Sequence, residues 1–220
     1  KSTLSRSLAT YSIARNIAGN HADLVFMTNE MLAGETSRRI HAALKDLWAG
    51  GRTDDQLWKD IDSSMRIYDR VYSWSKMDRI LYWERPTIAI IDSLDALDWP
   101  EGTDYAKADE KHKARSNSLA EMSIKYNCFI SIPANASEEN QRALRDGNLE
   151  KVQSAMAFGS SWYLNKSSWS FVLTRDKMTH NRTNIKRVKN RPTGLIGEVW
   201  SMGYSPEGKY YYDLATVPLN

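Results

Sequence analysis

The chain begins with three residues of the kind that bind phosphate. Lys1, Ser2 and Thr3 run directly into a segment with helical spacing. A phosphate-binding loop of the form G-x-x-x-x-G-K-[ST] ends in this way: its lysine reaches the β- and γ-phosphates, the next hydroxyl binds Mg²⁺, and the phosphates lie at a helix N-terminus. We therefore expect Lys1, Ser2 and Thr3 to contact ATP and Ser2 to contribute to a Mg²⁺ site. The alternative is that Ser2 is an ordinary helix N-cap.

An acid at the end of an apolar run is the second candidate. Residues 88–91 are continuously apolar and are followed by Asp92. A strand buried on both faces has this pattern, and the carboxyl end of such a strand is where open α/β sheets bind ligands. We expect Asp92 to contact the nucleotide and hold Mg²⁺, as a Walker B aspartate does. The alternative is an aspartate that caps the next helix or turn.

A second strand delivers another acid to the same edge. Residues 24–28 are apolar or β-branched and are followed by Asn29 and Glu30. A carboxylate at this place can orient or deprotonate an attacking water molecule, so Glu30 is a candidate catalytic residue. The alternative is an acid in the first turn of a helix, where the helix dipole favours it.

Basic residues gather late in the chain. The segment 175–191 contains seven Lys and Arg residues, namely Arg175, Lys177, Arg182, Lys186, Arg187, Lys189 and Arg191, with Asp176 as its only acid. Because residues two apart on a strand point to the same side, Lys189 and Arg191 are predicted to project toward one target. The alternative is a pair of solvated bases at the end of a hairpin.

These candidates need elements to position them. Short β-rich runs alternate with longer segments of helical spacing, which is typical of βα units that feed a mostly parallel sheet. We predict strands at 24–28, 65–68, 87–92, 128–132, 170–174, 185–189, 197–201 and 209–213, and helices at 2–18, 30–48 or 34–48, 75–83 and 107–126. Turn residues at 181, 191–194 and 205–208 favour antiparallel hairpins in the last part of the chain. The predicted fold class is α/β, a mostly parallel sheet flanked by helices, extended by C-terminal antiparallel strands.

Composition sets the broad class. The 220 residues are 41% hydrophobic, carry a net charge of +3 and include one cysteine, Cys128. This length suits one domain, the charge alone does not indicate a nucleic-acid binder, and the single thiol is expected to be buried and inert. Apolar runs are too short to cross a bilayer, so we expect a soluble, non-secreted protein without a membrane partner. Its compartment stays open between cytoplasmic, mitochondrial and phage-encoded settings.

Five segments in this order resemble the ATPase domain of hexameric replicative DNA helicases, the group of DnaB, Twinkle and the phage primase-helicases. Lys1-Ser2-Thr3 falls at the family's Walker A end, and Ile90-Ile91-Asp92 resembles its Walker B strand. The remaining segments are Asn29-Glu30-Met31, similar to S-x-E-M; 159–166, similar to the G-S-x-x-W-x-N-K segment of the Twinkle-like branch; and 188–194, similar to the K-x-R strand end.

The resemblance implies a RecA-like P-loop fold over residues 1–220 and an ATP-dependent helicase that moves along single-stranded DNA in replication. It implies that Glu30 is catalytic and that Lys189 and Arg191 act on the γ-phosphate held by a neighbouring subunit of a homo-oligomeric ring, expected to be a hexamer. Primase is a possible further partner. The family's channel loop corresponds to 135–157, and the residues expected at DNA are Arg142, Arg145, Lys151, Trp162 and Lys166.

Two departures from the family keep other functions open. The γ-phosphate sensor, a histidine or glutamine, corresponds here to Ile132 or Ala134, and neither side chain can hydrogen-bond a phosphate. The first strand and the glycine-rich loop are also expected to precede Lys1. The alternatives are therefore a RecA-like recombinase, loader or regulatory ATPase that binds DNA without unwinding it, or a nucleotide-binding scaffold with little or no hydrolysis.

Overall fold

A computed structural model describes residues 2–47, 51–104, 106–134, 161–175, 182–205 and 210–213. The chain divides into two compact units. The first unit comprises Lys1–Asp104, Glu121–Ala134 and Glu207–Tyr210, and the second comprises Tyr105–Ala120, Asn135–Pro206 and Tyr211–Asn220. The expectation that the chain forms one domain stays a prediction, and each unit is described by itself.

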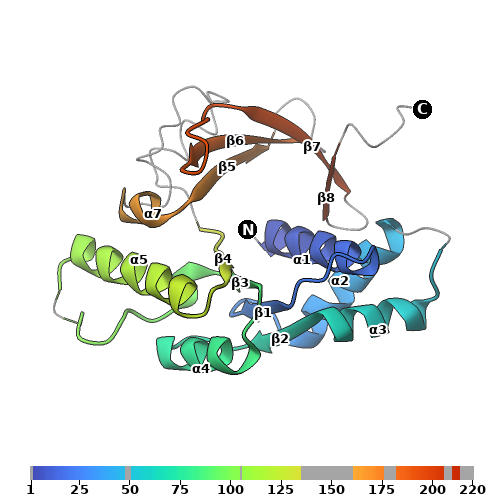
Figure 1. Ribbon diagram of the computed structural model, residues 1–220, viewed down its shortest axis with the longest axis horizontal. Helices are drawn as coiled ribbons and strands as arrows, with labels where there is room; N and C mark the ends of the chain where they lie inside the picture. The colour runs from blue at the N-terminus through green and yellow to red at the C-terminus, as the bar shows by residue number, and fades with distance from the viewer. Residues whose placement is uncertain are drawn as a thin grey trace. The chain divides into compact units, whose positions relative to one another are not determined.

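A parallel sheet forms the centre of the first unit. Its strands are β1 (Leu24–Thr28), β2 (Met65–Asp69), β3 (Ile88–Asp92) and β4 (Phe129–Ser131), in the order β2-β1-β3-β4. All neighbouring pairs are parallel, and Thr28 is in register with both Asp69 and Asp92. Three strands therefore end at the same level, with polar side chains at their carboxyl ends. The predicted parallel core is confirmed (Figure 1).

Helices cover this sheet. They are α1 (Ser2–Ile17), α2 (Ala33–Leu47), α3 (Asp54–Ser64), α4 (Trp74–Glu84) and a short 3₁₀ turn, η1 (Leu94–Ala96). Apolar side chains of α1, α2 and α3 pack on Leu24, Phe26 and Ile90 in a buried cluster. Figure 1 shows α1 and α4 on opposite sides of the sheet. Because both faces are covered, β1 is buried along its whole length, as its continuous apolar sequence predicted.

Helix α3 was not predicted from the sequence. Its N-terminus is a capping box: the Gln56 N–H donates to Thr53 Oγ1, and the Thr53 N–H donates to Gln56 Oε1. The spacing Thr53-x-x-Gln56 was a readable sequence signal for a helix start. Leu57 and Ile61 then bury the apolar side of the helix. The predicted helices at 2–18, 34–48, 75–83 and 107–126 are confirmed within one or two residues of their ends.

The second sheet has the strand order β5-β6-β7-β8. Its strands are β5 (Trp169–Arg175), β6 (Arg182–Asn190), β7 (Val199–Ser205) and β8 (Tyr210–Asp213). The pairs β5·β6 and β6·β7 are antiparallel, and a bulge separates Ser170 from Phe171. The predicted C-terminal antiparallel strands are therefore confirmed.

Two helices complete the described elements. The long α5 (Ala108–Lys125) begins in the second unit and ends in the first, and α7 (Ser161–Lys166) was not predicted. None of the helices in the described ranges is long and apolar enough to cross a bilayer. Cys128 is buried as a free thiol, and burial raises its pKa, which agrees with the predicted inert role.

Candidate active site

The carboxyl edge of the parallel sheet brings together acids that are far apart in the sequence. Asp69 ends β2 and Asp92 ends β3, on either side of Thr28 at the end of β1. Asp92 is only 1% exposed. The Asn29 N–H donates to the Asp92 carbonyl at 2.9 Å, so the turn after β1 is tied to the end of β3. The predicted position of Asp92 at the ligand-binding edge agrees with this geometry.

Glu30 lies in the turn that joins β1 to α2. The Met31 N–H donates to Thr28 Oγ1 at 3.2 Å, which closes the turn around Glu30. The Glu30 side chain reaches back to the sheet, where Ser93 Oγ donates to Glu30 Oε1 at 2.9 Å. Glu30 precedes α2, which begins at Ala33, so the alternative of a first-turn helix acid does not describe it.

Sequence reasoning missed Ser93. It directly follows Asp92, with a cis peptide bond between them, and is 1% exposed. A serine after a strand-ending aspartate was visible in the sequence, but nothing local indicated a partner 63 residues earlier.

Asn29 is a second residue that the sequence did not single out. Its side-chain Oδ1 and Nδ2 are both buried, and neither has a hydrogen-bond partner among the described residues. Buried amide atoms normally find partners, so this group has hydrogen-bonding capacity directly beside Glu30.

Asp69 contributes a third carboxylate to the edge. Its Oδ2 accepts a hydrogen bond from the Ala33 N–H at 3.2 Å, so a strand residue caps the start of α2. Lys76 Nζ donates to the carbonyls of Asp69 and Arg70 at 3.1 and 3.0 Å. Asp69 is thus committed to holding the turn and helix that carry Glu30.

The start of α1 lies beside the same turn. Arg6 is 5% exposed; its Nη1 contacts Met31 Sδ at 3.3 Å and its Nη2 donates to Thr3 Oγ1 at 3.3 Å. Thr3 and the Glu30–Met31 turn are therefore linked through one guanidinium. Ser2 begins α1. Lys1 lies outside the described residues, and its predicted phosphate contact stays a prediction.

The donor set of this edge suits Mg²⁺. Hard cations prefer oxygen ligands, and Mg²⁺ at phosphate sites uses only one or two carboxylates because phosphates and waters complete its shell. Asp92 supplies a buried carboxylate, while Glu30 and Asp69 are already bonded to Ser93 and Ala33. Within the described ranges, no three His, Cys, Asp or Glu side chains gather in a metal cage.

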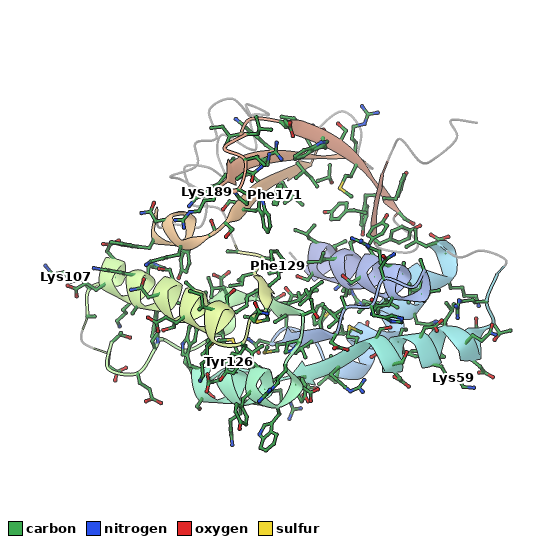
Figure 2. The ribbon with its side chains drawn as sticks, in the orientation of Figure 1. Lys59, Lys107, Tyr126, Phe129, Phe171 and Lys189 are labelled. Carbon is green, nitrogen blue, oxygen red and sulfur yellow. The ribbon has the colours of Figure 1, made fainter. Side chains whose placement is uncertain are left out.

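Lys189 and Arg191 lie in the second unit. β6 continues to Asn190 and Arg191 begins the following turn, so the strand-alternation argument covers Lys189 but not Arg191. Burial, followed by the like charge of Arg191, lowers the pKa of Lys189. Arg191 Nη2 donates to the Asn165 carbonyl in α7, which connects two segments that the sequence analysis had singled out separately. Figure 2 shows Lys189 on the antiparallel sheet that also carries Phe171.

Asn190 fixes the turn between these two bases. It is 5% exposed; its Oδ1 accepts from Trp169 Nε1 at 3.0 Å, and its Nδ2 donates to Thr193 Oγ1. The Gly194 N–H donates to the Asn190 carbonyl at 2.8 Å, and Gly194 adopts a φ of 70°, which favours glycine. The predicted turn at 191–194 is confirmed.

Trp162 has internal partners. Its indole Nε1 donates to Asp109 Oδ1 at 2.9 Å, and Lys113 Nζ lies 4.9 Å from its ring centroid. The neighbouring Tyr163 is buried, and its hydroxyl is 3.0 Å from His112 Nδ1. Trp162 and Tyr163 therefore attach α7 to α5, a structural role that the sequence did not indicate. Lys166, at the end of α7, is exposed.

The other predicted site residues are divided between described and undescribed segments. Arg142, Arg145 and Lys151 lie outside the described residues, as does the predicted channel loop 135–157. Ile132 and Ala134 follow β4 and are half-buried. Among the described residues, no structural feature supplies either of them with a phosphate-binding group.

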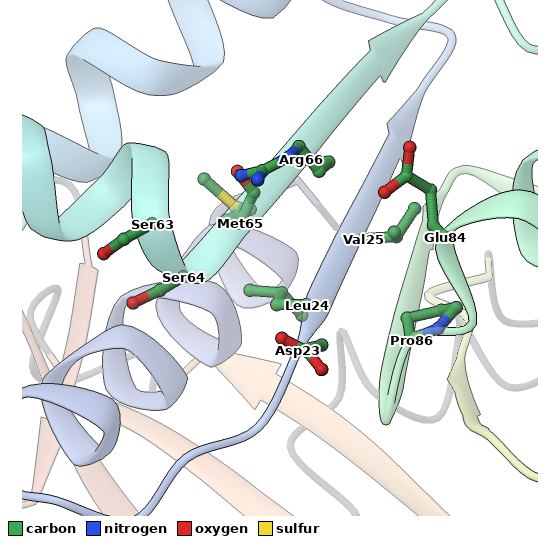
Figure 3. Close-up of a pocket in the computed structure, with 9 residues that line it drawn as sticks. All are labelled: Asp23, Leu24, Val25, Ser63, Ser64, Met65, Arg66, Glu84 and Pro86. Carbon is green, nitrogen blue, oxygen red and sulfur yellow. The ribbon is translucent and has the colours of Figure 1, made fainter.

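A small cavity of about 70 Å³ lies at the opposite, amino edge of the parallel sheet. Figure 3 shows its lining, which includes Asp23 before β1, Ser63 and Ser64 before β2, and Pro86 before β3. Ligands of open α/β sheets bind at the carboxyl ends of the strands, so this cavity lies away from Glu30 and Asp92 and does not belong to the candidate site.

Comparison with solved structures identifies the fold. The chain is similar to a solved ATPase domain of a DnaB-like replicative helicase, with a TM-score of 0.71 and 16% sequence identity over 95% of this chain and 81% of that one. The chain has the fold of a DnaB-like helicase ATPase domain. A structure described as a DnaB-like replicative helicase and its interactions with primase gives the same TM-score and identity, with 96% of this chain and 55% of that chain covered.

The DnaB-like fold confirms the predicted RecA-like architecture of a parallel sheet extended by antiparallel strands. The chain spans about half the length of the second of these structures. No family model matches the sequence, and no curated protein does. The fold is therefore recognisable in three dimensions, although at 16% identity little of the sequence is shared.

Proposed function

We propose that this chain is the ATP-hydrolysing motor domain of a ring-type DNA helicase, which couples hydrolysis to translocation on single-stranded DNA during replication. The observation that carries the proposal is the pairing at one sheet edge of Glu30 with the Asp92–Ser93 strand end. A base for the attacking water and a carboxylate for the metal are the two acids that this reaction requires. The DnaB-like fold supports the same assignment.

The proposed reaction uses each group at this edge. Glu30 accepts a proton from water, the water oxygen attacks the γ-phosphorus, and the bond from that phosphorus to the β–γ bridging oxygen breaks to release ADP. Asp92 and the Ser2 hydroxyl hold Mg²⁺, and Lys1 and Thr3 lie with Ser2 at the phosphates. Bound Mg²⁺ neutralises charge on the β- and γ-phosphate oxygens.

Lys189 and Arg191 are proposed to act across a subunit interface. An arginine finger stabilises transition-state charge on the γ-phosphate of a neighbouring nucleotide, so hydrolysis depends on assembly of a homo-oligomeric ring, for which we propose a hexamer. Burial of Asn190 and its contacts hold the turn that presents both bases.

Contacts to single-stranded DNA are proposed for Arg142, Arg145, Lys151, Trp162 and Lys166, which combine cations for the backbone with an aromatic ring. Lys166 is the exposed cation of α7. Trp162 would contact DNA through its ring, because its N–H donates to Asp109. Primase is a proposed partner of the complete protein.

The test is DNA-stimulated ATP hydrolysis by the complete protein. We expect Lys1→Ala and Glu30→Gln to lower kcat by roughly 10²-fold or more, because they remove a phosphate ligand and the general base. Arg191→Ala is expected to lower kcat by roughly 10³-fold.

Matched controls lie in helices α2 and α3. Glu35→Gln, Lys59→Ala and Arg38→Ala change the same residue types outside the site, and they should retain wild-type turnover. Strand displacement on 5′- and 3′-tailed forks measures unwinding. Full hydrolysis by Glu30→Gln would contradict the assigned base, and full hydrolysis by Arg191→Ala would contradict the finger.

The apolar residues Ile132 and Ala134 favour a second candidate, a nucleotide-binding scaffold with little or no hydrolysis. This function predicts ATP binding and ring contacts without turnover, whereas a RecA-like recombinase or loader predicts turnover on DNA without strand displacement. Equilibrium binding of a fluorescent ATP analogue, measured beside hydrolysis and fork unwinding, separates the three functions.

A further inference from the structure

The Glu30 side chain is held by a residue outside its own strand. Ser93 Oγ donates to Glu30 Oε1 at 2.9 Å, although the two residues are 63 positions apart in the sequence. The contact exists because β1 and β3 are adjacent parallel strands whose ends, Thr28 and Asp92, are in register.

The two partners differ in freedom. Ser93 is 1% exposed, whereas Glu30 is an exposed side chain. An exposed glutamate samples several rotamers, and confining it to one costs conformational entropy at each turnover. A hydrogen bond from a fixed, buried hydroxyl to one carboxylate oxygen removes much of that freedom before the nucleotide arrives.

The backbone around both residues is also tied. The Asn29 N–H donates to the Asp92 carbonyl at 2.9 Å, one residue before each member of the Ser93–Glu30 pair. Thr28 Oγ1 accepts from the Met31 N–H on the far side of Glu30. The distance between the proposed metal ligand, Asp92, and the proposed base, Glu30, is therefore set by short contacts rather than by a flexible loop.

We propose that Ser93 is a positioning residue for Glu30: its hydroxyl holds Oε1 and assigns Oε2 to the proton of the attacking water. The inference rests on the proposed ATPase function. Ser93 touches neither water nor nucleotide in this assignment, and it acts through the glutamate. Because Ser93 directly follows Asp92, movement of the metal ligand is transmitted to the base.

Kinetics of the complete protein test this role. Ser93→Ala is expected to lower kcat by about 10-fold with little change in KM for ATP, because the glutamate is still present but less well oriented. In a Glu30→Gln background the same substitution should have no further effect on kcat. Ser93→Thr keeps a hydroxyl and should restore most of the activity; Ser116→Ala, a buried serine bonded to its own helix, is the matched control.

A second readout does not depend on turnover. In nucleotide-free protein, the effects of Ser93→Ala and Glu30→Gln on the free energy of unfolding should be non-additive, because each removes the same hydrogen bond. Additive stabilities together with an unchanged kcat in Ser93→Ala would overturn the inference. Absence of hydrolysis in the wild type, with the stability coupling intact, would instead overturn the proposed function and leave the Ser93–Glu30 contact established.

Discussion

At the scale of single residues, Asp78 shows how a few contacts set a pH dependence. Burial alone would raise the pKa of this carboxyl, but hydrogen bonds from Tyr126 and Lys125 outweigh burial, so the pKa lies below its ordinary value of 3.8. Tyr126 Oη donates to Asp78 Oδ1 at 2.6 Å, and Lys125 Nζ lies 2.9 Å from the same oxygen. These contacts join α4 to the end of α5.

Asp78→Asn is expected to lower the free energy of unfolding near neutral pH by about 1 kcal/mol, a modest value because solvent screens a carboxylate that is 37% exposed. A carboxyl with a depressed folded-state pKa stabilises the fold above its unfolded pKa and loses that effect as the pH falls through the folded value. The difference between wild type and variant should therefore vanish below about pH 3. Urea unfolding at several pH values measures it, with Asp104→Asn as an exposed control. A difference that persists in acid would exclude the charge as its cause.

At the scale of elements, α3 depends on a local sequence signal. Thr53 and Gln56 exchange hydrogen bonds at its N-terminus, and Leu57 and Ile61 attach it to the core. The helix leads directly into β2, whose last residue, Asp69, caps α2 at Ala33. The stability of α3 thus supports the turn that carries Glu30.

Thr53→Ala should destabilise the first unit by about 1 kcal/mol, because it leaves the Gln56 N–H without its side-chain acceptor. Thr53→Ser keeps the hydroxyl and should stay within a few tenths of a kcal/mol of the wild type. Thermal unfolding compares the two variants. Equal melting temperatures for Ala and Ser would show that the capping box contributes little here.

At the scale of the whole molecule, the proposed mechanism places its groups in different compact units. Glu30 and Asp92 belong to the first unit, and Lys189 and Arg191 belong to the second. In the proposed ring, the second unit of one subunit serves the nucleotide held by the first unit of its neighbour. Hydrolysis should therefore be a property of the assembly.

Mixing variants tests this arrangement. Glu30→Gln and Arg191→Ala should each be nearly inactive alone, but an equimolar mixture assembled together should recover about one quarter of wild-type activity, since about one interface in four combines an intact Glu30 with an intact Arg191. Mixing Glu30→Gln with the double variant Glu30→Gln/Arg191→Ala is the control and should recover nothing. A mixture no more active than its components would argue against a finger acting between subunits.

The sequence by itself determined the element types and several site positions. The apolar runs at 24–28 and 88–91 predicted buried parallel strands, since only a strand covered on both faces can be apolar throughout, and both strands were found. The acids Glu30 and Asp92 followed from their positions after those strands. The missed α3 had a readable cap, so that omission was not forced by the physics.

Tertiary structure alone decided which side chains meet. The register of Thr28 with Asp92, the Ser93–Glu30 hydrogen bond and the attachment of Trp162 to Asp109 each join residues that are distant in the chain. Strand register and helix docking are fixed by the packing of the whole core, and local spacing does not encode them. The sequence could therefore indicate which residues carry the chemistry, but only the folded chain decided which neighbours hold them in place.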